Sequence, residues 1–104
     1  MIAYTVTITF GDAELARAWR RWLAEEHMRE VCAAGALDAE LLERDPTEAG
    51  EAVLEVRYHF SSHEAFAAYE RDHAPRLRAE GLARVPPGAK VGFRRAVAHV
   101  VARS

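Results

Sequence analysis

Residues 1–10, MIAYTVTITF, have the alternating pattern that decides the fold. Large apolar side chains alternate with small or hydroxyl-bearing ones, and a period of two residues is typical of a β-strand with two different faces. The apolar set is Ile2, Tyr4, Val6, Ile8 and Phe10, and the other set is Ala3, Thr5, Thr7 and Thr9. We expect helices to cover the apolar face, whereas the threonine face needs another cover.

The size and composition predict one globular domain. The chain has 104 residues, of which 50% are hydrophobic and 29% are charged, a balance that argues against disorder. The formal net charge is −2, so nucleic acid is not an expected partner. No segment is long and apolar enough to cross a bilayer, so we expect no membrane partner and a cytoplasmic location. Cys32 is the single cysteine, which excludes an internal disulfide.

The segment after the first strand is predicted to form an amphipathic helix that ends near Glu26. Asp12 is suited to cap its N-terminus, because an aspartate oxygen accepts hydrogen bonds from the free backbone N–H groups of the first turn. Four large apolar residues follow at helical spacing and define one buried stripe: Leu15, Trp19, Trp22 and Leu23. A second short helix over residues 28–34 is expected to end at Gly35.

The next part of the chain is predicted to form two strands and a broken helix. Residues 52–60 alternate as clearly as the first strand, whereas residues 36–44 are a weaker strand prediction. Ser61 and Glu64 have the spacing of a capping box, which predicts that a helix begins after Ser61. Pro75 predicts a break or a new first turn in this helix.

A last strand is predicted over residues 91–102, which makes the element order strand–helix–strand–strand–helix–strand. This order is typical of a ferredoxin-like βαββαβ two-layer α+β sandwich, with residues 1–104 as a single domain. Right-handed crossovers place the first and third strands at the centre of a four-stranded antiparallel sheet, with both helices on one face. The other face stays bare, so we expect a homodimer that forms through the sheet side.

Two histidines occupy matching places in the two halves of the chain. Glu26-His27 and Asp72-His73 each stand at a predicted helix end, and a glycine follows each histidine eight residues later. The alternative interpretation is a recurrent way of ending helices with no further role. A histidine near a helix C-terminus is well placed to act as a general acid or base. His27 and His73 are therefore the candidate catalytic residues, although His73 alternatively caps a backbone carbonyl.

The chain resembles an uncharacterised bacterial family, the domain of unknown function 4286. The resemblance is carried by Met1-Ile2, Tyr4, Val6-Thr7, Trp19-x-x-Trp22-Leu23, His27, Tyr69, His73-Ala74-Pro75, Leu77-Arg78 and Phe93-x-Arg95. It implies a ferredoxin-like domain related to the dimeric α/β barrel group, in which two sheets pair across a twofold axis and enclose a pocket. Activities in that group include cofactor-independent oxygenation, isomerisation and haem chemistry, and some members only bind ligands.

Five residues are candidates for binding a ligand. Thr7, Arg57 and His59 belong to the polar sheet face, which is expected to suit a water-filled space between two subunits, since buried unpaired charge is costly. Tyr69 lies on the second helix. Arg95 points to the opposite sheet face from its neighbour Arg94, and it either orients an acidic ligand or forms a structural ion pair.

The sequence supports two functions and no metal site. His59 and His63 are spaced like metal ligands but straddle a strand-to-helix boundary, and no phosphate-binding loop is present, so we expect no metal and no cofactor. The first function is a homodimeric ligand-binding or assembly domain whose ligand is small and carries negative charge. The alternative is a cofactor-independent enzyme, monooxygenase-like or isomerase-like, in which His27 and His73 transfer protons.

Overall fold

The computed structural model describes residues 1–104 and has a four-stranded antiparallel sheet with helices packed against it. The elements in chain order are β1 (Ile2–Phe10), α1 (Ala13–Trp22), the π-helical segment η1 (Leu23–His27), α2 (Met28–Ala33), β2 (Asp38–Glu43), β3 (Ala52–Phe60), α3 (His63–Asp72), α4 (Ala74–Leu82) and β4 (Val91–His99).

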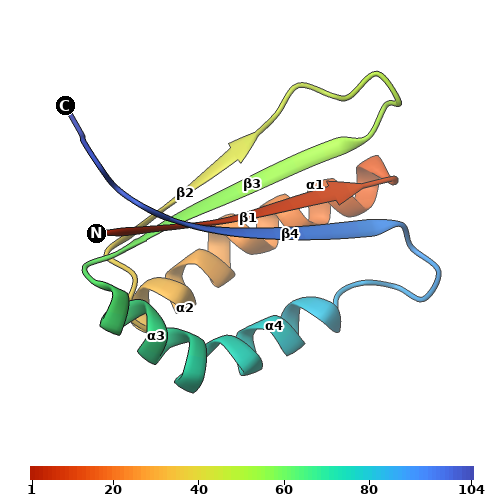
Figure 1. Cartoon of the computed structure of the whole chain (residues 1–104). Helices are drawn as coiled ribbons and strands as arrows, with labels where there is room; N and C mark the ends of the chain where they lie inside the picture. Colours follow the sequence, from red (N-terminus) through yellow and green to blue (C-terminus); the bar gives the residue numbers. More distant parts are fainter.

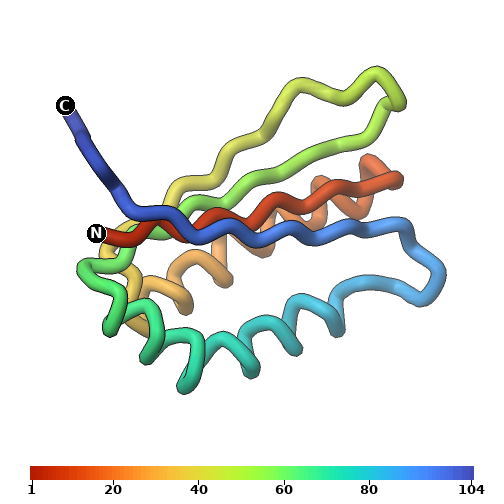
Figure 2. Tube along the Cα trace, viewed as in Figure 1, coloured from red at the N-terminus to blue at the C-terminus, as the bar shows by residue number.

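The strand order β2-β3-β1-β4 confirms the ferredoxin-like topology, with β1 and β3 at the centre of the sheet. Figure 1 shows all helices in one layer beneath the sheet, and Figure 2 shows the C-terminal tail leaving the body of the molecule. The second face of the sheet carries no helix, as the sequence predicted. None of the helices has the length and apolarity needed to span a bilayer.

The register of the strands separates an apolar face from a polar one. In the central pair, Tyr4 lies opposite Tyr58 on the helix-covered face, whereas Thr5 lies opposite Arg57 on the open face. Along β4, Arg95 pairs with Val6 and Arg94 with Thr7, so the two arginines lie on opposite faces, as predicted.

Aromatic rings fill much of the core between the sheet and the helices. The buried rings are Tyr4, Phe10, Trp19, Trp22, Tyr58, Phe60, Phe66 and Tyr69. The Trp19 ring lies 5.0 Å from the Trp22 ring and 5.8 Å from the Phe10 ring, so the stripe predicted on the first helix packs on the apolar face of β1. Such aromatic pairs add to the stability gained from burial.

Three local predictions differ from the structure. The strands β2 and β4 are shorter than the predicted ranges 36–44 and 91–102. The helix α3 is capped by Ser62 instead of Ser61, because the Ser62 Oγ accepts a hydrogen bond of 3.1 Å from the Ala65 N–H. The predicted break at Pro75, by contrast, is confirmed. Pro75 lies in the first turn of α4, where a missing N–H costs nothing.

Truncating the core ring of Phe60 is expected to destabilise the fold strongly. Phe60 is 0% exposed and packs against Phe66 and Tyr69. The substitution Phe60→Ala should lower the free energy of unfolding by about 3–5 kcal/mol, since it removes buried contacts and leaves a cavity. Urea denaturation measures the change. Val101, which is 95% exposed, provides the control, and Val101→Ala should shift stability by less than about 0.5 kcal/mol.

Candidate functional site

A cavity of about 60 Å³ lies between the helices and the covered face of the sheet. Strands β1, β3 and β4 form one wall, and α1, η1, α3 and α4 form the other. Most of the lining is apolar, including Val6, Ile8, Trp19, Trp22 and Phe93. The lining residues with polar groups are Tyr4, His27, Tyr58, Tyr69, Arg78 and Arg95. A small-molecule site usually has this composition, with a few polar groups in a mostly apolar concave surface.

The π-helical segment brings His27 into the cavity wall. The Met28 N–H donates to the Leu23 carbonyl five residues back, in place of the four-residue spacing of an α-helix. This wider turn sets His27 against Trp22, five positions earlier, with ring centroids 4.6 Å apart and 31° between the planes. Glu26, which follows Trp22 by four positions, remains exposed. The extra residue therefore turns an imidazole, and not a carboxylate, toward the cavity.

His27 is held in a neutral form by its surroundings. Burial lowers its pKa below the ordinary value of 6.5, the nearby Glu80 opposes this shift, and Arg84 adds to it. Its Nδ1 atom is buried and has no hydrogen-bond partner. A neutral imidazole with an unpaired ring nitrogen can exchange a hydrogen bond or a proton with a bound molecule.

Arg78 connects α4 with β1. Its Nη2 donates to the Tyr4 hydroxyl at 3.2 Å and to the Glu70 carboxylate, which also forms an ion pair with it. Its Nε atom is buried without a partner. A buried N–H that lacks an acceptor costs roughly 1–3 kcal/mol, so a group that reached it would recover that energy.

Tyr69 and Arg95 occupy the part of the cavity wall formed by α3 and β4. Burial raises the pKa of Tyr69 to about 12, while the positive charges of Arg78 and Arg95 oppose the rise. The phenol is therefore protonated and can donate a hydrogen bond. Arg95 is exposed, with its guanidinium carbon 5.8 Å from the Phe93 ring, so the cavity opens to solvent beside it.

Leu82 lies at the other exposed part of the cavity rim, and Arg84, outside the lining, contacts the two lining indoles. The Arg84 guanidinium carbon lies 4.6 Å from the Trp22 ring, and its backbone carbonyl accepts a hydrogen bond of 3.4 Å from the Trp19 Nε1–H. These contacts fix both indoles in the cavity wall. Leu82 lines the cavity and is 61% exposed, so it stands at the mouth.

The structure brings three of the predicted site residues to this cavity: His27, Tyr69 and Arg95. His73 is not among the lining residues. It ends α3 and precedes α4, with its backbone N–H donating to the Tyr69 carbonyl at 2.9 Å. The two histidines are thus not gathered at one cavity. Thr7, Arg57 and His59 lie on the open face, on the other side of the sheet from the cavity.

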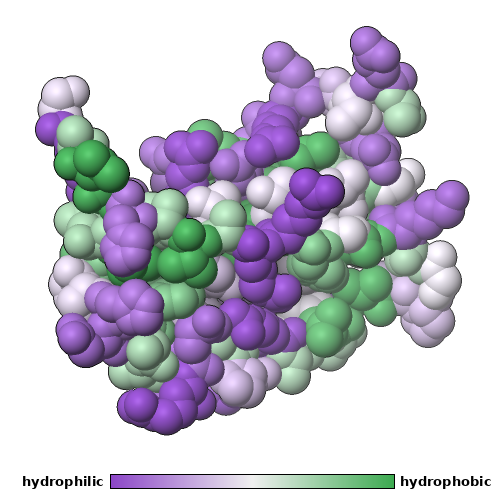
Figure 3. Space-filling view, viewed as in Figure 1, coloured by the Kyte–Doolittle hydropathy of each residue, from purple (hydrophilic) through white to green (hydrophobic).

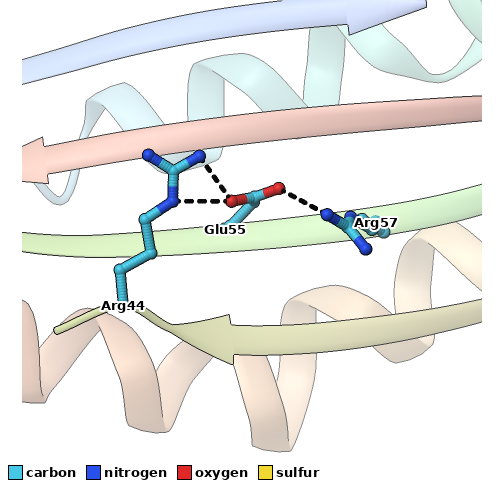
Figure 4. A network of polar contacts seen from close by, with 3 residues as sticks. All are labelled: Arg44, Glu55 and Arg57. Atoms are coloured by element: carbon cyan, nitrogen blue, oxygen red, sulfur yellow. Dashed lines mark hydrogen bonds and ion pairs between the residues drawn. The ribbon is translucent and has the colours of Figure 1, made fainter. Parts of the chain in front are cut away.

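The open face carries an ion-pair network that the sequence did not reveal. Glu55 is only 7% exposed, and its carboxylate contacts the Arg44 Nη2 at 2.7 Å and the Arg57 Nη2 at 3.2 Å (Figure 4). His59 likewise pairs with Asp38 at 2.7 Å. Glu55 and Asp38 are therefore paired within the chain, whereas Arg94 on the same face takes part in no ion pair.

The structure gives no support for a metal site at His59 and His63 or elsewhere in the chain. No group of three or more His, Cys, Asp or Glu side chains is arranged so that it could hold a metal ion. The His63 ring stacks on His99 at 6.3 Å, while the His59 ring turns to Asp38, so the suggestive spacing of His59 and His63 does not converge.

Sequence reasoning did not identify Arg78, Tyr4 or Trp22 as parts of the site. Their positions were assigned to the core or to a helix surface, because periodicity predicts burial and gives no information about an unfilled space. One signal for the π-helical segment is present in the sequence. Beyond Leu23, α-helical periodicity would bury Glu26 and Glu30, whereas one extra residue buries Met28 and Val31 instead.

The element order and the strand order define a ferredoxin-like α+β domain. Within that class, the chain belongs to the family described as Domain of unknown function (DUF4286), which matches residues 1–99. A comparison with functionally curated proteins finds no match to the sequence.

Solved structures share this fold over nearly the whole chain. A dimeric ferredoxin-like protein from an uncultured marine organism is 11% identical, with a TM-score of 0.71 and coverage of 100% of this chain and 98% of that one. A proposed antibiotic biosynthesis monooxygenase from Bacillus cereus is 20% identical, with a TM-score of 0.65 and coverage of 99% and 95%. The haem degrader MhuD from Mycobacterium tuberculosis, solved with two haems in its active site, is 22% identical, with a TM-score of 0.61 and coverage of 98% of each chain.

The lowered pKa of His27 predicts a loss of stability in acid. Because the folded-state pKa lies below 6.5, the unfolded chain binds the proton more readily. The contribution of the neutral His27 to the free energy of unfolding is complete above pH 6.5. It is lost as the pH falls toward and through the folded-state pKa. Denaturant titrations measure the free energy of unfolding at pH 8 and at pH 5. Its decrease from pH 8 to pH 5 should be smaller for His27→Gln than for the natural chain. An equal decrease in both proteins would contradict the burial of a neutral imidazole.

Proposed function

We propose that this protein is a homodimer that binds a small molecule in the cavity between its helices and its sheet. The observation that carries the proposal is the cavity itself, in which His27, Arg78 and Arg95 interrupt an otherwise apolar and aromatic lining. Two polar atoms of its lining side chains, His27 Nδ1 and Arg78 Nε, have no partner in the chain. In natural proteins such atoms usually have a partner, and a bound group is one source of it.

The cavity volume limits the size of an enclosed ligand. An engineered cavity of about 150 Å³ holds benzene, so about 60 Å³ encloses only a few non-hydrogen atoms. A porphyrin of the kind bound by MhuD is far larger. The shared fold is therefore not a sufficient reason to assign haem binding to this chain. We expect a small molecule, or the end group of a larger one that leaves through the mouth at Leu82.

A second candidate function is proton-transfer catalysis in the same cavity. The observation that favours it is the neutral His27, whose unpaired Nδ1 is available as a base beside the protonated phenol of Tyr69. A two-histidine mechanism would need His73 as well, and His73 lies outside the cavity lining. In this form of the proposal His27 alone handles the proton, and His73 has a structural role at the junction of α3 and α4.

The homodimer is proposed to form through the open face of the sheet. Dimeric ferredoxin-like proteins from marine organisms share the fold. Glu55 and Asp38 are paired within the chain, threonine and alanine side chains occupy much of the rest of the face, and a partner subunit would have to accommodate the charge of Arg94. Figure 3 shows hydrophobic surface along β4 and on the C-terminal tail, interrupted by hydrophilic side chains. Val101 in that tail is 95% exposed and is available for contact with a partner subunit.

Filling the cavity from its rim at Leu82 should weaken ligand binding without disturbing the fold. Trp19 and Trp22 are the only tryptophans and both line the cavity, so their indole NMR signals report its occupancy. We expect short-chain acids, alcohols and amides to include at least one compound that shifts both signals. Leu82→Phe should weaken that binding at least tenfold.

The matched control for this test is Leu37→Phe. Leu37 is 57% exposed, nearly as much as Leu82, but it does not line the cavity. The control should bind as the natural chain does. If no compound in the panel shifts the indole signals, or if Leu82→Phe and Leu37→Phe bind equally, the proposed site is wrong. In the same assay, His27→Ala should weaken binding more than His73→Ala.

A charge on the open face should separate the two subunits. Ala96 lies on this face of β4, is exposed in the single chain and pairs in register with Thr5. Ala96→Glu should therefore be harmless to folding but should bury an unpaired carboxylate in the dimer, which is costly. Light scattering is expected to show a mass near 23 kDa, about twice 11.6 kDa, for the natural chain and a monomer for the variant. Ala18→Glu on the exposed face of α1 should remain dimeric, and a monomeric natural chain would contradict the proposal.

A further inference from the structure

The lining of the cavity has hydrogen-bond donors and positive charge but no acid. Among its sixteen residues there is no aspartate and no glutamate, whereas there are two arginines, a histidine and three tyrosines. Burial raises the pKa of both Tyr58 and Tyr69, so these phenols remain protonated donors at neutral pH. A set of donors without acceptor charge favours a ligand that brings oxygen acceptors.

The two arginines differ in how much of their charge is already used. Arg78 forms an ion pair with Glu70, whose carboxylate neutralises it. Arg95 takes part in none of the ion pairs of the chain. Since His27 is neutral, the lining together with Glu70 carries one uncompensated positive charge, which belongs to Arg95. A ligand with a single negative charge complements it.

The remaining lining and the volume describe the rest of the ligand. Val6, Ile8, Trp19 and Phe93 offer only apolar contacts. A volume of about 60 Å³ encloses a short apolar chain, while the carboxylate lies in the opening beside the exposed Arg95. Sulfate, and phosphate near neutral pH, carry more than one negative charge, which exceeds the single uncompensated positive charge of this lining.

Given that the proposed function is correct, we propose that the ligand is a small aliphatic monocarboxylate, or the carboxylate end of a larger apolar molecule, and that Arg95 is the residue that selects it. The carboxylate lies toward the Arg95 guanidinium and the Tyr69 hydroxyl, and the apolar chain lies among the aromatic rings. Arg78 Nε and His27 Nδ1 provide further polar contacts once the side chains adjust to the ligand.

The test compares butyrate with butyramide, which has nearly the same shape and no charge. Binding is followed through the Trp19 and Trp22 indole signals of the intact protein. Butyrate should bind at least tenfold more tightly, since a charge-assisted hydrogen bond exceeds a neutral one by about 1.4 kcal/mol or more. Arg95→Met should remove this preference, and Arg95→Lys, which keeps the charge, should retain part of it.

The matched control is Arg94→Met, because Arg94 is the next residue on the same strand but lies on the opposite face of the sheet. This variant should prefer butyrate as the natural chain does. If butyramide binds as tightly as butyrate, or if Arg94→Met and Arg95→Met behave alike, the carboxylate assignment is wrong while the cavity remains a binding site. If neither compound binds and no neutral compound does so either, the proposed function itself is overturned.

Discussion

The antiparallel pairing of β1 with β3 is the constraint on which the rest of the structure depends. In this register Tyr4 meets Tyr58 and Ile8 meets Leu54, so both central strands present their large apolar side chains to the same face. A slip of one residue would turn all of them to the other side. The helices pack on this apolar surface. Because the surface is continuous, the buried aromatic rings of α1 and α3 contact aromatic rings of the strands.

The cavity is a consequence of how α4 and the π-helical segment approach that surface. Gly81 of α4 allows a close approach, since a Cβ at this position would lie 3.3 Å from the Trp19 ring. Beside it, the wider turn of η1 places His27 on Trp22 instead of continuing the apolar stripe. Departures from regular helix geometry often occur at functional sites. Here the departure places the one neutral, unpaired imidazole of the cavity wall.

The two faces of the sheet differ in whether their buried polar groups have hydrogen-bond or ion-pair partners. On the open face, Glu55 is enclosed by two arginines of its own chain and has no unpaired capacity for a ligand. On the covered face, His27 and Arg78 each retain a buried nitrogen without a partner. A satisfied network stabilises structure, whereas unsatisfied groups in a cavity are available for binding. For this reason the covered face, and not the open one, is the better candidate for function.

Much of the fold was determined by the sequence alone. The alternation of the first strand, the stripe from Leu15 to Leu23 and the proline at residue 75 depend on neighbours within a few positions, so local rules predicted the topology and the central strands. Arg95 and Tyr69 both belong to the pattern shared with the family, and Arg95 was predicted as a site residue for that reason, while alternation placed it on the opposite face from Arg94. The same rules could not show that the space beside them is unfilled.

Only the tertiary structure decided where the site is and which groups share it. Whether Arg95 has a carboxylate partner depends on residues distant in sequence, and so does the pairing of Arg78 with Tyr4, which are 74 positions apart. The volume of the cavity depends on how three α-helices, the π-helical segment and three strands meet, and no single segment contains that information. Secondary structure follows from local spacing, whereas burial, pKa shifts and unpaired polar atoms arise from long-range packing, and these are the properties that give a site its chemistry.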